Sequence, residues 1–267
     1  MTQRVRFDWA GRPVDIEYIW AGVDDPAAPL LVVLHEGLGS VSMWRDFPDR
    51  LARACGVRAL VYSRPGYGRS TPRAADERWG LDFMHRQAQQ VLPALLQALG
   101  VRGRYALLGH SDGGSIALLH AAHAPQRVNA CIVMAPHILV EEFGLKSIRE
   151  ARVQYEQGGL RAPLSRHHDD VDSAFYGWND IWLAPDFPQW QITSELKNIT
   201  APVLAIQGED DPYGTMAQID GIANGLPGTQ LVKLPGCGHS PHRDQPESVI
   251  RACQAFLAPL LHQETHA

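Results

Sequence analysis

Three short glycine-flanked stretches of the chain carry a serine, an aspartate and a histidine that could together hydrolyse a carbonyl compound. The stretches are GHSDG with Ser111, GEDDP with Asp211 and GCGHS with His239. A serine hydroxyl needs a base to take its proton, and that base needs an acid to fix its tautomer. We therefore interpret Ser111 as a nucleophile, His239 as its base and Asp211 as the group that orients the base.

The glycines around Ser111 distinguish it from its neighbour Asp112, whose carboxylate could also act as a nucleophile. Gly109 and Gly113 stand two residues before and two residues after Ser111. A sharp turn from strand to helix needs residues without side chains at these places, because Cβ atoms there would collide. The turn exposes the central side chain, and only Ser111 is centred in it. We expect Ser111 to attack.

Both partners of Ser111 have an alternative close by in the sequence. Asp210 precedes Asp211, and two adjacent carboxylates differ only in the direction that the loop gives them. His242 follows His239 in the stretch GCGHSPH and is the second candidate for the base. Asp211 and His239 remain the predicted pair because each directly follows an apolar, strand-like run and both come after Ser111 in the chain.

An attack by Ser111 also requires backbone N–H groups that stabilise the negative charge on the carbonyl oxygen. The N–H of Asp112 is one predicted donor, because it follows the nucleophile directly. The second donor is expected in the glycine-rich loop HEGLGSVSMW, where Gly37 and Leu38 are the candidates. The same loop also fits a plain turn between a strand and a helix, which uses glycine for its backbone freedom.

The elements that position these residues follow from the pattern of apolar side chains. Apolar residues alternate over 5–9 and 14–20, which predicts an antiparallel hairpin. Six short apolar runs follow, each ended by Gly, Pro or Ser, as buried parallel strands are: LLVVLH, RALVYS, RYALLGH, NACIVMAP, PVLAIQG and TQLVKLPG. Helix-like stretches separate them, one with Pro93 as a kink and one closed by Pro125. The fold class is therefore α/β, with a mostly parallel, doubly wound sheet.

This rhythm is interrupted over residues 136–195, where no strand fits. The stretch EEFGLKSIREARVQYEQGG is helix-like, and HHDDVDSAFYGWNDIWLAPDFPQW is dense in aromatic residues. We predict a helical cap at 136–195, inserted into a core formed by residues 1–135 and 196–267. Such a cap would cover the carboxyl ends of the strands, where open α/β sheets bind ligands. Its aromatic residues could line a substrate pocket or pack as the core of the cap: Phe175, Tyr176, Trp178, Trp182, Phe187 and Trp190. Trp178 and Trp182 are the residues predicted to bind substrate. They are four residues apart and would share one helical face, so the alternative is that they pack together on the sheet domain.

Several of these motifs together resemble the α/β-hydrolase superfamily over almost the whole chain apart from the cap. They are LHEGLGS, YSRPGYGRS, GHSDGGS, GEDDP and GCGHSPH. The first departs from the common His-Gly pair by placing Glu36 after His35, which leaves the second oxyanion donor open. The resemblance implies an α/β-hydrolase fold with a helical cap and a triad in the order Ser, Asp, His.

The elbow itself is similar to that of the valacyclovir hydrolase (biphenyl hydrolase-like) branch of serine esterases. In that branch the aspartate after the nucleophile binds the α-amino group of amino-acid esters. The resemblance therefore implies that the Asp112 side chain binds substrate. The alternative is that Asp112 braces the elbow by pairing with an arginine of SRPGYGR, either Arg64 or Arg69.

The predicted function is hydrolysis of a small-molecule carboxylic ester through an acyl-enzyme, without a cofactor, with aminoacyl esters as one substrate class. The same residues could open lactones, cleave activated amides or hydrolyse carbon–carbon bonds. The alternative from another class is a catalytically silent binding protein with this fold. No metal site is expected, because His167 and His168 are neighbours and would point apart. They and the nearby Asp169, Asp170 and Asp172 are expected on a solvated face.

Charge and composition agree with a small-molecule substrate and with the absence of nucleic-acid or membrane partners. The chain of 267 residues has 24 Lys and Arg against 29 Asp and Glu, a net charge of −5, so it has no basic surplus. Its four cysteines are widely spaced and are expected to be free thiols. The first residues lack an apolar signal segment, and we expect a soluble, cytoplasmic protein of unknown oligomeric state.

Overall fold

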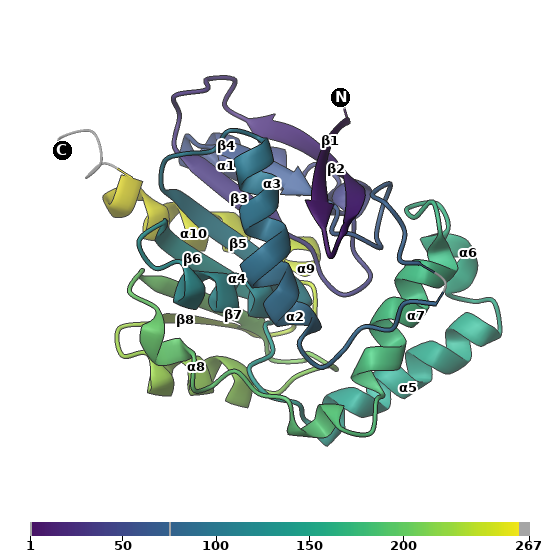
Figure 1. Cartoon of the computed structure of the whole chain (residues 1–267). Helices are drawn as coiled ribbons and strands as arrows, with labels where there is room; N and C mark the ends of the chain where they lie inside the picture. The colour runs from purple at the N-terminus through teal and green to yellow at the C-terminus, as the bar shows by residue number, and fades with distance from the viewer. Residues whose placement is uncertain (1, 75, 262–267) are drawn as a thin grey trace.

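A computed structural model describes residues 2–74 and 76–261 of the chain. Its centre is an eight-stranded sheet in the order β1-β2-β4-β3-β5-β6-β7-β8 (Figure 1). The strands are β1 (Gln3–Trp9), β2 (Arg12–Gly22), β3 (Leu30–Leu34), β4 (Arg58–Tyr62), β5 (Tyr105–His110), β6 (Val128–Met134), β7 (Val203–Gly208) and β8 (Gln230–Leu234). All six apolar runs of the sequence form strands of this sheet.

The sheet is antiparallel at one end and parallel over the rest. β1 and β2 form the predicted hairpin, with Val5 opposite Ile16, and β2 then pairs antiparallel with β4. The pairs from β4 through β3, β5, β6 and β7 to β8 are all parallel. The predicted fold class is confirmed: a mostly parallel sheet with an N-terminal antiparallel hairpin. Parallel strands bring the ends of β5, β7 and β8 to one edge of the sheet.

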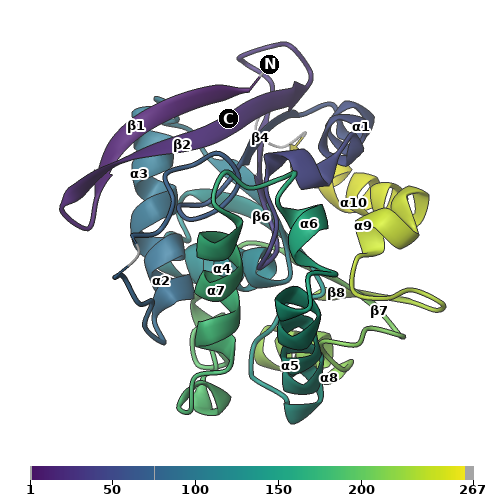
Figure 2. The ribbon, with the colours of Figure 1, turned by 90° about the vertical axis from the view of Figure 1, so that its right-hand side faces the viewer.

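Helices cover both faces of the sheet (Figures 1 and 2). On one face lie α1 (Phe47–Cys55), α9 (Pro241–Asp244) and α10 (Pro246–Leu261), preceded in the chain by the short η1 (Val41–Trp44). The other face carries α2 (Phe83–Arg86), η2 (Gln87–Val91), α3 (Leu92–Ala98), α4 (Asp112–His123), η4 (Leu196–Asn198) and α8 (Ala217–Gly225). Each face buries its own apolar cluster, which is the layered arrangement of a doubly wound fold.

Pro93 lies at a break in the helical stretch that contains it, as expected. The stretch begins as α2, passes through the single π-helical turn η2 and continues as α3. Pro93 is at the first turn of α3, where its missing N–H leaves the fewest hydrogen bonds unmade. Pro125 follows the end of α4 at His123.

The segment 136–195, hereafter the cap segment, is helical and lies beside the carboxyl ends of the strands (Figure 2). It contains α5 (Glu142–Glu156), α6 (Arg161–Leu164), α7 (Val171–Trp182) and η3 (Phe187–Gln189). His168 joins it to the core, because its ring accepts from the N–H of Gly68 and donates to the carbonyl oxygen of Leu38, both at 2.9 Å. The division of the chain at residues 136 and 195 stays a prediction.

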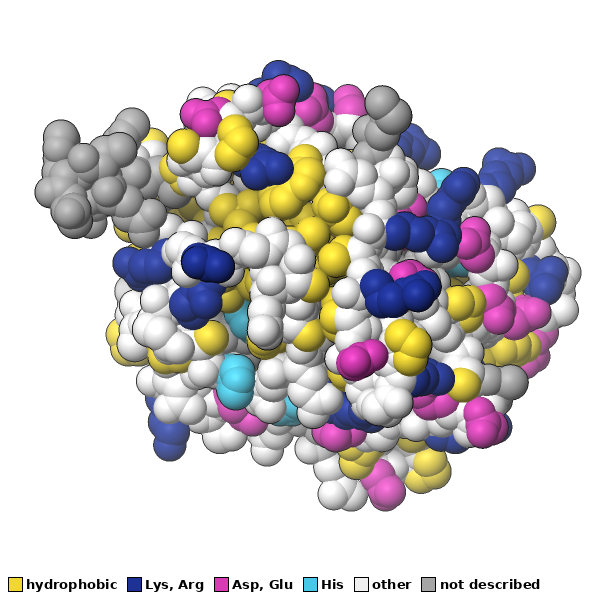
Figure 3. Space-filling model, turned by 45° about the horizontal axis from the view of Figure 1, so that its top comes forward, with side chains coloured by type: hydrophobic (Ala, Val, Ile, Leu, Met, Phe, Trp, Pro, Cys, Tyr) yellow, Lys and Arg dark blue, Asp and Glu magenta, His cyan; other side chains and the backbone are white. Residues whose placement is uncertain are grey.

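The surface in Figure 3 carries Lys and Arg side chains interspersed with Asp and Glu side chains. This mixture of positive and negative side chains agrees with the small net charge of −5. Within the described ranges, no helix has the length and apolar character needed to cross a membrane. Cys131, Cys237 and Cys253 are buried free thiols, and Cys55 is a partly buried one.

Candidate active site

The turn between β5 and α4 holds Ser111 in a strained backbone conformation. Its φ of 53° and ψ of −122° lie outside the regions that residues with side chains usually adopt. The flanking glycines permit the turn, since a Cβ on Gly109 would lie 2.1 Å from the Gly113 carbonyl oxygen. A Cβ on Gly113 would lie 2.2 Å from the carbonyl oxygen of Leu34. The crowding that the sequence predicts at these two glycines is therefore present.

Ser111, His239 and Asp211 form one continuous chain of hydrogen bonds. Ser111 Oγ is 2.9 Å from His239 Nε2, and His239 Nδ1 is 2.9 Å from both carboxylate oxygens of Asp211. Ser111 comes from the end of β5, Asp211 from the loop after β7 and His239 from the loop after β8. The structure thus brings together the three residues that the sequence selected from stretches 100 and 28 residues apart.

The surroundings of Asp211 keep its carboxylate ionised. Burial alone would raise its pKa, but the hydrogen bond and charge of His239 outweigh this and lower the pKa below its usual range. The backbone N–H of Tyr213 donates to Asp211 Oδ1 at 2.8 Å and acts in the same direction. A permanently charged Asp211 can hold the Nδ1–H tautomer of His239, which leaves Nε2 free to accept a proton.

The alternatives Asp210 and His242 lie elsewhere. Asp210 is exposed, and the His239 ring contacts Asp211 instead. His242 is buried against the rings of Trp44 and Phe47, with centroids 4.7 and 5.4 Å away, and burial lowers its pKa to about 3. Its ring therefore packs as an uncharged aromatic group, and the Ser111 hydroxyl bonds to His239 instead.

The loop expected to supply the second oxyanion donor is held by Arg64 and His35. The carbonyl oxygen of Glu36 accepts from Arg64 Nη2 at 2.8 Å and from His35 Nδ1 at 2.7 Å. His35 Nε2 in turn accepts from the N–H of Arg64 at 2.9 Å. These bonds fix the peptide that precedes Gly37, whose N–H points away from the Glu36 carbonyl in a trans peptide.

The predicted oxyanion donors are next to the elbow. Asp112 is the first residue of α4, so its N–H has no partner within the helix. Gly113 lies against the carbonyl oxygens of Leu34 and His35, which places the start of α4 beside the loop that carries Gly37 and Leu38. The geometry leaves the choice between Gly37 and Leu38 open, as the sequence does.

The Asp112 side chain is buried and contacts the cap segment. Its Oδ1 accepts from Trp182 Nε1 at 3.2 Å, and its Oδ2 has no hydrogen-bond partner among the described residues. Burial raises its pKa to about 6, although the charge of Arg64 and the Trp182 hydrogen bond oppose the rise. The bracing pair with Arg64 or Arg69 is not formed as a hydrogen bond, because Trp182 takes the one partnered oxygen.

The two tryptophans selected from the cap segment both reach the site, and α7 places them one turn apart. Trp178 lies against the oxyanion loop, since a Cβ on Gly37 would be 2.3 Å from its indole ring. Trp182 contacts Asp112 and packs against the rings of His137 and Phe187. The other aromatic residues of the segment pack mainly on one another, as Tyr155 does on Phe175 and Phe187 on Trp190.

Three further polar residues surround the site and were not selected from the sequence. His110 Nε2 donates to the carbonyl oxygen of His239 at 2.6 Å, and its Nδ1 is 3.5 Å from Glu36 Oε2. Burial would raise the pKa of Glu36, but His110 outweighs it and lowers the pKa well below its usual range. His137 is buried near His239, and burial lowers its pKa to about 3. Only the position of His110 inside GHSDG hinted at such a role.

One expectation about the cap segment was wrong. His167 is partly exposed and bonds to Ser42, but His168 is buried between two core loops and does not lie on a solvated face. Its ring satisfies backbone groups that would otherwise lack partners. In the described parts of the chain, no group of His, Cys, Asp and Glu could hold a metal ion.

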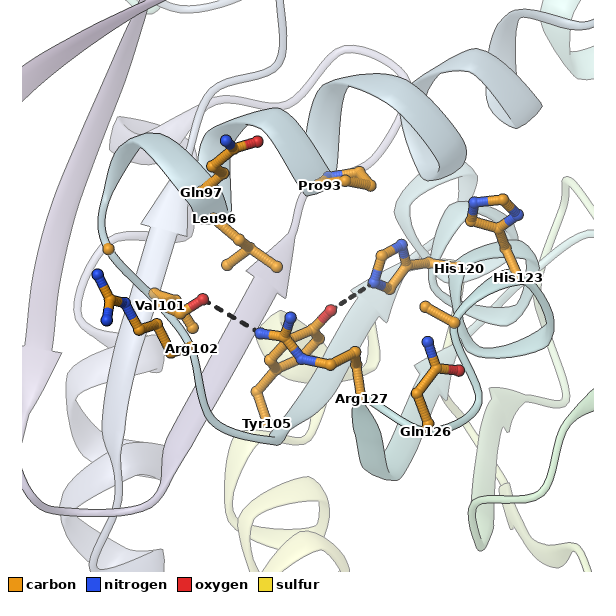
Figure 4. A pocket seen from close by; sticks show the side chains of 12 residues that line it. Pro93, Leu96, Gln97, Val101, Arg102, Tyr105, His120, His123, Gln126 and Arg127 are labelled. Atoms are coloured by element: carbon orange, nitrogen blue, oxygen red, sulfur yellow. Dashed lines mark hydrogen bonds between the residues drawn. The ribbon is translucent and has the colours of Figure 1, made fainter.

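A groove of about 770 Å³ lies away from these residues, at the amino end of β5 (Figure 4). It is bordered by α3, the end of α4 and the side chains of Tyr105, His120 and Arg127. Tyr105 begins β5 and Ser111 directly follows its other end, about 20 Å away by the rise of a strand. The Tyr105 hydroxyl and His120 are hydrogen-bonded to each other, and no serine or cysteine lines the groove. The groove is not the candidate active site.

The chain is similar in sequence to proteins that are named as hydrolases. The sequence pattern described as the alpha/beta hydrolase family matches residues 31–252. The chain is 24% identical over 255 residues to 2-hydroxy-6-oxo-6-phenylhexa-2,4-dienoate hydrolase of Burkholderia cepacia, covering 85% of this chain and 87% of that protein. It is 28% identical over 205 residues to the serine hydrolase BPHL of Mus musculus, covering 74% of this chain and 68% of that protein.

Two further comparisons concern length and fold. The polyketide synthase ThaQ of Burkholderia thailandensis is 28% identical over 250 residues, which are 85% of this chain, and the chain spans 12% of that protein. The crystal structure of proline iminopeptidase from Mycobacterium smegmatis superposes with a TM-score of 0.77 at 20% identity, covering 99% of this chain and 100% of that one. This likeness concerns the fold alone.

Proposed function

Because the chain belongs to the alpha/beta hydrolase family, we propose that it is a serine hydrolase that cleaves a small-molecule carboxylic ester through an acyl-enzyme. The observation that carries the proposal is the chain of hydrogen bonds from Asp211 through His239 to Ser111, with each distance 2.9 Å. The strained turn at Ser111 supports the same activity, and so does the N–H of Asp112, which has no partner within α4.

The first half of the reaction forms the acyl-enzyme. His239 Nε2 takes the proton from Ser111 Oγ while this oxygen attacks the ester carbon. The N–H of Asp112 and a second N–H, from Gly37 or Leu38, stabilise the negative charge on the carbonyl oxygen. The protonated His239 then gives its proton to the leaving alcohol, and the acyl group stays on Ser111.

The second half releases the acid. A water molecule loses a proton to His239 and attacks the acyl carbon, and the proton returns to Ser111 Oγ as this bond breaks. Asp211 remains ionised throughout and stabilises the imidazolium form of His239. No cofactor or metal ion takes part in any of these steps.

An ester is the preferred bond because its alkoxide is a better leaving group than the amide ion or the carbanion that the alternative bonds would release, and His239 supplies the one proton that the leaving alcohol needs. The same residues could attack lactones, activated amides or the carbon–carbon bond of a diketone. The resemblance of the elbow to the valacyclovir hydrolase branch adds aminoacyl esters to the substrates that need testing. A panel of methyl, aminoacyl, lactone and amide substrates, with the carboxylate product quantified by chromatography, ranks these classes.

Labelling by a fluorophosphonate probe tests the proposal directly, because the probe forms a stable bond only with an activated serine. We expect one label on the wild-type protein, located at Ser111 by peptide mapping, and no label on Ser111→Ala. A folded wild-type protein without any label would instead support the silent binding protein with this fold. Folding is checked by circular dichroism on the same samples.

A further inference from the structure

Three buried polar atoms beside the elbow lack a hydrogen-bond partner among the described residues. They are Asp112 Oδ2, Arg64 Nη1 and the hydroxyl of Tyr67. The three side chains are almost inaccessible to solvent, with 0%, 0% and 1% of their surface exposed. A buried polar group without a partner costs about 1–3 kcal/mol, so three of them in one place indicate that something else satisfies them.

The three atoms belong to one neighbourhood. The Arg64 guanidinium carbon lies 4.7 Å from the centre of the Tyr67 ring. The charge of Arg64 lowers the pKa of Asp112 against the effect of burial, and the charges of Arg64 and Asp112 both act on the pKa of Tyr67. No hydrogen bond joins the Asp112 carboxylate to the Arg64 guanidinium. The charge of Arg64 therefore acts on Asp112 without a direct contact between the two groups.

The other polar side-chain atoms of Asp112 and Arg64 already have hydrogen-bond partners, and these bonds hold the two unpartnered atoms in place. Asp112 Oδ1 is held by Trp182, and Arg64 Nη2 is held by the carbonyl oxygen of Glu36. Arg64 Nε is 3.4 Å from His35 Nε2. Turning either side chain to satisfy its last atom would break a hydrogen bond that it already has, so one acceptor on Asp112 and one donor on Arg64 stay without a partner among the described residues.

The balance of charge decides what these atoms can bind. An ammonium group would be attracted by Asp112 and repelled by Arg64, and a carboxylate would meet the opposite pair of forces. A neutral group with both a donor and an acceptor avoids either repulsion. A hydroxyl can donate to Asp112 Oδ2 and accept from Arg64 Nη1, and a primary carboxamide can do the same.

We propose that Asp112, Arg64 and Tyr67 form a specificity subsite for a neutral donor and acceptor group, a hydroxyl or a carboxamide, on the acyl part of the substrate. The proposal rests on the proposed function, because it assigns the acyl group to the side of Ser111 on which Asp112 lies. The Asp112 N–H stabilises the oxyanion, so its side chain reaches a group a few bonds from the reacting carbon. The proposal therefore opposes the ammonium-binding role that the resemblance implies for Asp112.

The test compares four methyl esters that differ in one group: 3-hydroxybutanoate, butanoate, 3-aminobutanoate and the half ester of succinate. Binding to the Ser111→Ala protein is measured by calorimetry, and turnover by the wild-type protein is measured by acid release. We expect the hydroxy ester to bind at least about tenfold more tightly than the other three, as sites built for a substrate hydroxyl do. The binding readout does not depend on whether Ser111 is a nucleophile, so failure of turnover alone overturns only the proposed function.

The variant Asp112→Asn, made in the Ser111→Ala protein, makes the test sharper. It leaves Arg64 without its balancing charge, so the succinate half ester should gain at least about tenfold in affinity relative to butanoate. Asp46→Asn removes an exposed carboxylate outside the site and is the matched control, which should leave all four affinities unchanged. Equal affinities for the four esters, no binding of any, or a preference of the unsubstituted site for the ammonium or carboxylate ester each overturns the subsite.

Discussion

Trp182 of the cap segment donates its indole N–H to Asp112 of the elbow at 3.2 Å. The bond joins the last residue of α7 to the first residue of α4, 70 positions apart in the chain. Because Asp112 follows Ser111 directly, the bond ties α7 to the residue next to the candidate nucleophile. Part of the site is therefore built by the segment that lies over it.

Replacing Trp182 by Phe should destabilise the protein more than the same change at Trp190. Both tryptophans are buried and pack on Phe187, but the indole N–H of Trp190 has no partner among the described residues. Trp182→Phe removes a hydrogen bond to a carboxylate and should cost about 1.5–3 kcal/mol in the free energy of unfolding. Trp190→Phe should cost less than about 1 kcal/mol. Urea denaturation at pH 8 measures both, and equal losses would show that the N–H of Trp182 contributes nothing.

A methyl group on Gly37 should disrupt the candidate oxyanion loop. Its Cβ would lie 2.3 Å from the Trp178 ring, so either the loop or α7 must move. We expect Gly37→Ala to lower kcat by about 10²-fold or more, with a smaller effect on KM. Gly103→Ala, where a Cβ meets no atom within 4 Å, is the matched control and should behave as the wild type. Adding Trp178→Ala to Gly37→Ala should restore part of the activity, and no restoration would place the damage elsewhere.

The ends of the strands could be predicted from the sequence because neighbouring residues in the chain determine where a strand stops. Each apolar run stops at a turn residue, and a parallel sheet necessarily brings the ends of β5, β7 and β8 to one edge. For this reason Ser111, Asp211 and His239 could be selected before their distances were known. The sequence leaves Asp210 open as an alternative to Asp211, because the direction of one loop side chain depends on its packing.

The contacts between the cap segment and the core could not be predicted, because they depend on tertiary packing. From the sequence, Arg64 is considered only as a possible partner of Asp112, but its side chain is fully buried and holds the carbonyl oxygen of Glu36. His168 is buried for a similar reason, since it satisfies backbone groups of two loops that are far from it in sequence. No periodic pattern encodes such a partner.

The two histidines after β8 should differ sharply in their effect on activity. His239 bonds to Ser111 and Asp211, so His239→Ala should lower kcat by about 10⁴-fold or more. His242 packs between aromatic rings as a neutral group, and His242→Phe should retain activity within about tenfold. Steady-state kinetics with a methyl ester compares them, and a large loss in His242→Phe with an unchanged fold would return His242 to consideration as the base.

Asp112→Asn should make the stability of the protein less dependent on pH. Burial raises the pKa of Asp112 from about 3.8 when unfolded to about 6 when folded, so the native state binds this proton more tightly. Below about pH 4 the burial of this carboxyl therefore costs no stability through its charge. The native state loses stability as the pH rises to about 6, and above that pH the loss stays constant. The loss is on the order of 3 kcal/mol, because each pKa unit corresponds to about 1.4 kcal/mol.

The asparagine variant does not titrate and avoids this loss. Relative to the wild type, Asp112→Asn should therefore gain on the order of 3 kcal/mol in the free energy of unfolding between pH 4 and pH 8. Urea denaturation at both values measures the change, with Asp46→Asn as a control whose difference from the wild type should be nearly the same at both. A difference for Asp112→Asn that does not grow with pH would mean that Arg64 and Trp182 hold the buried carboxylate ionised at no net cost.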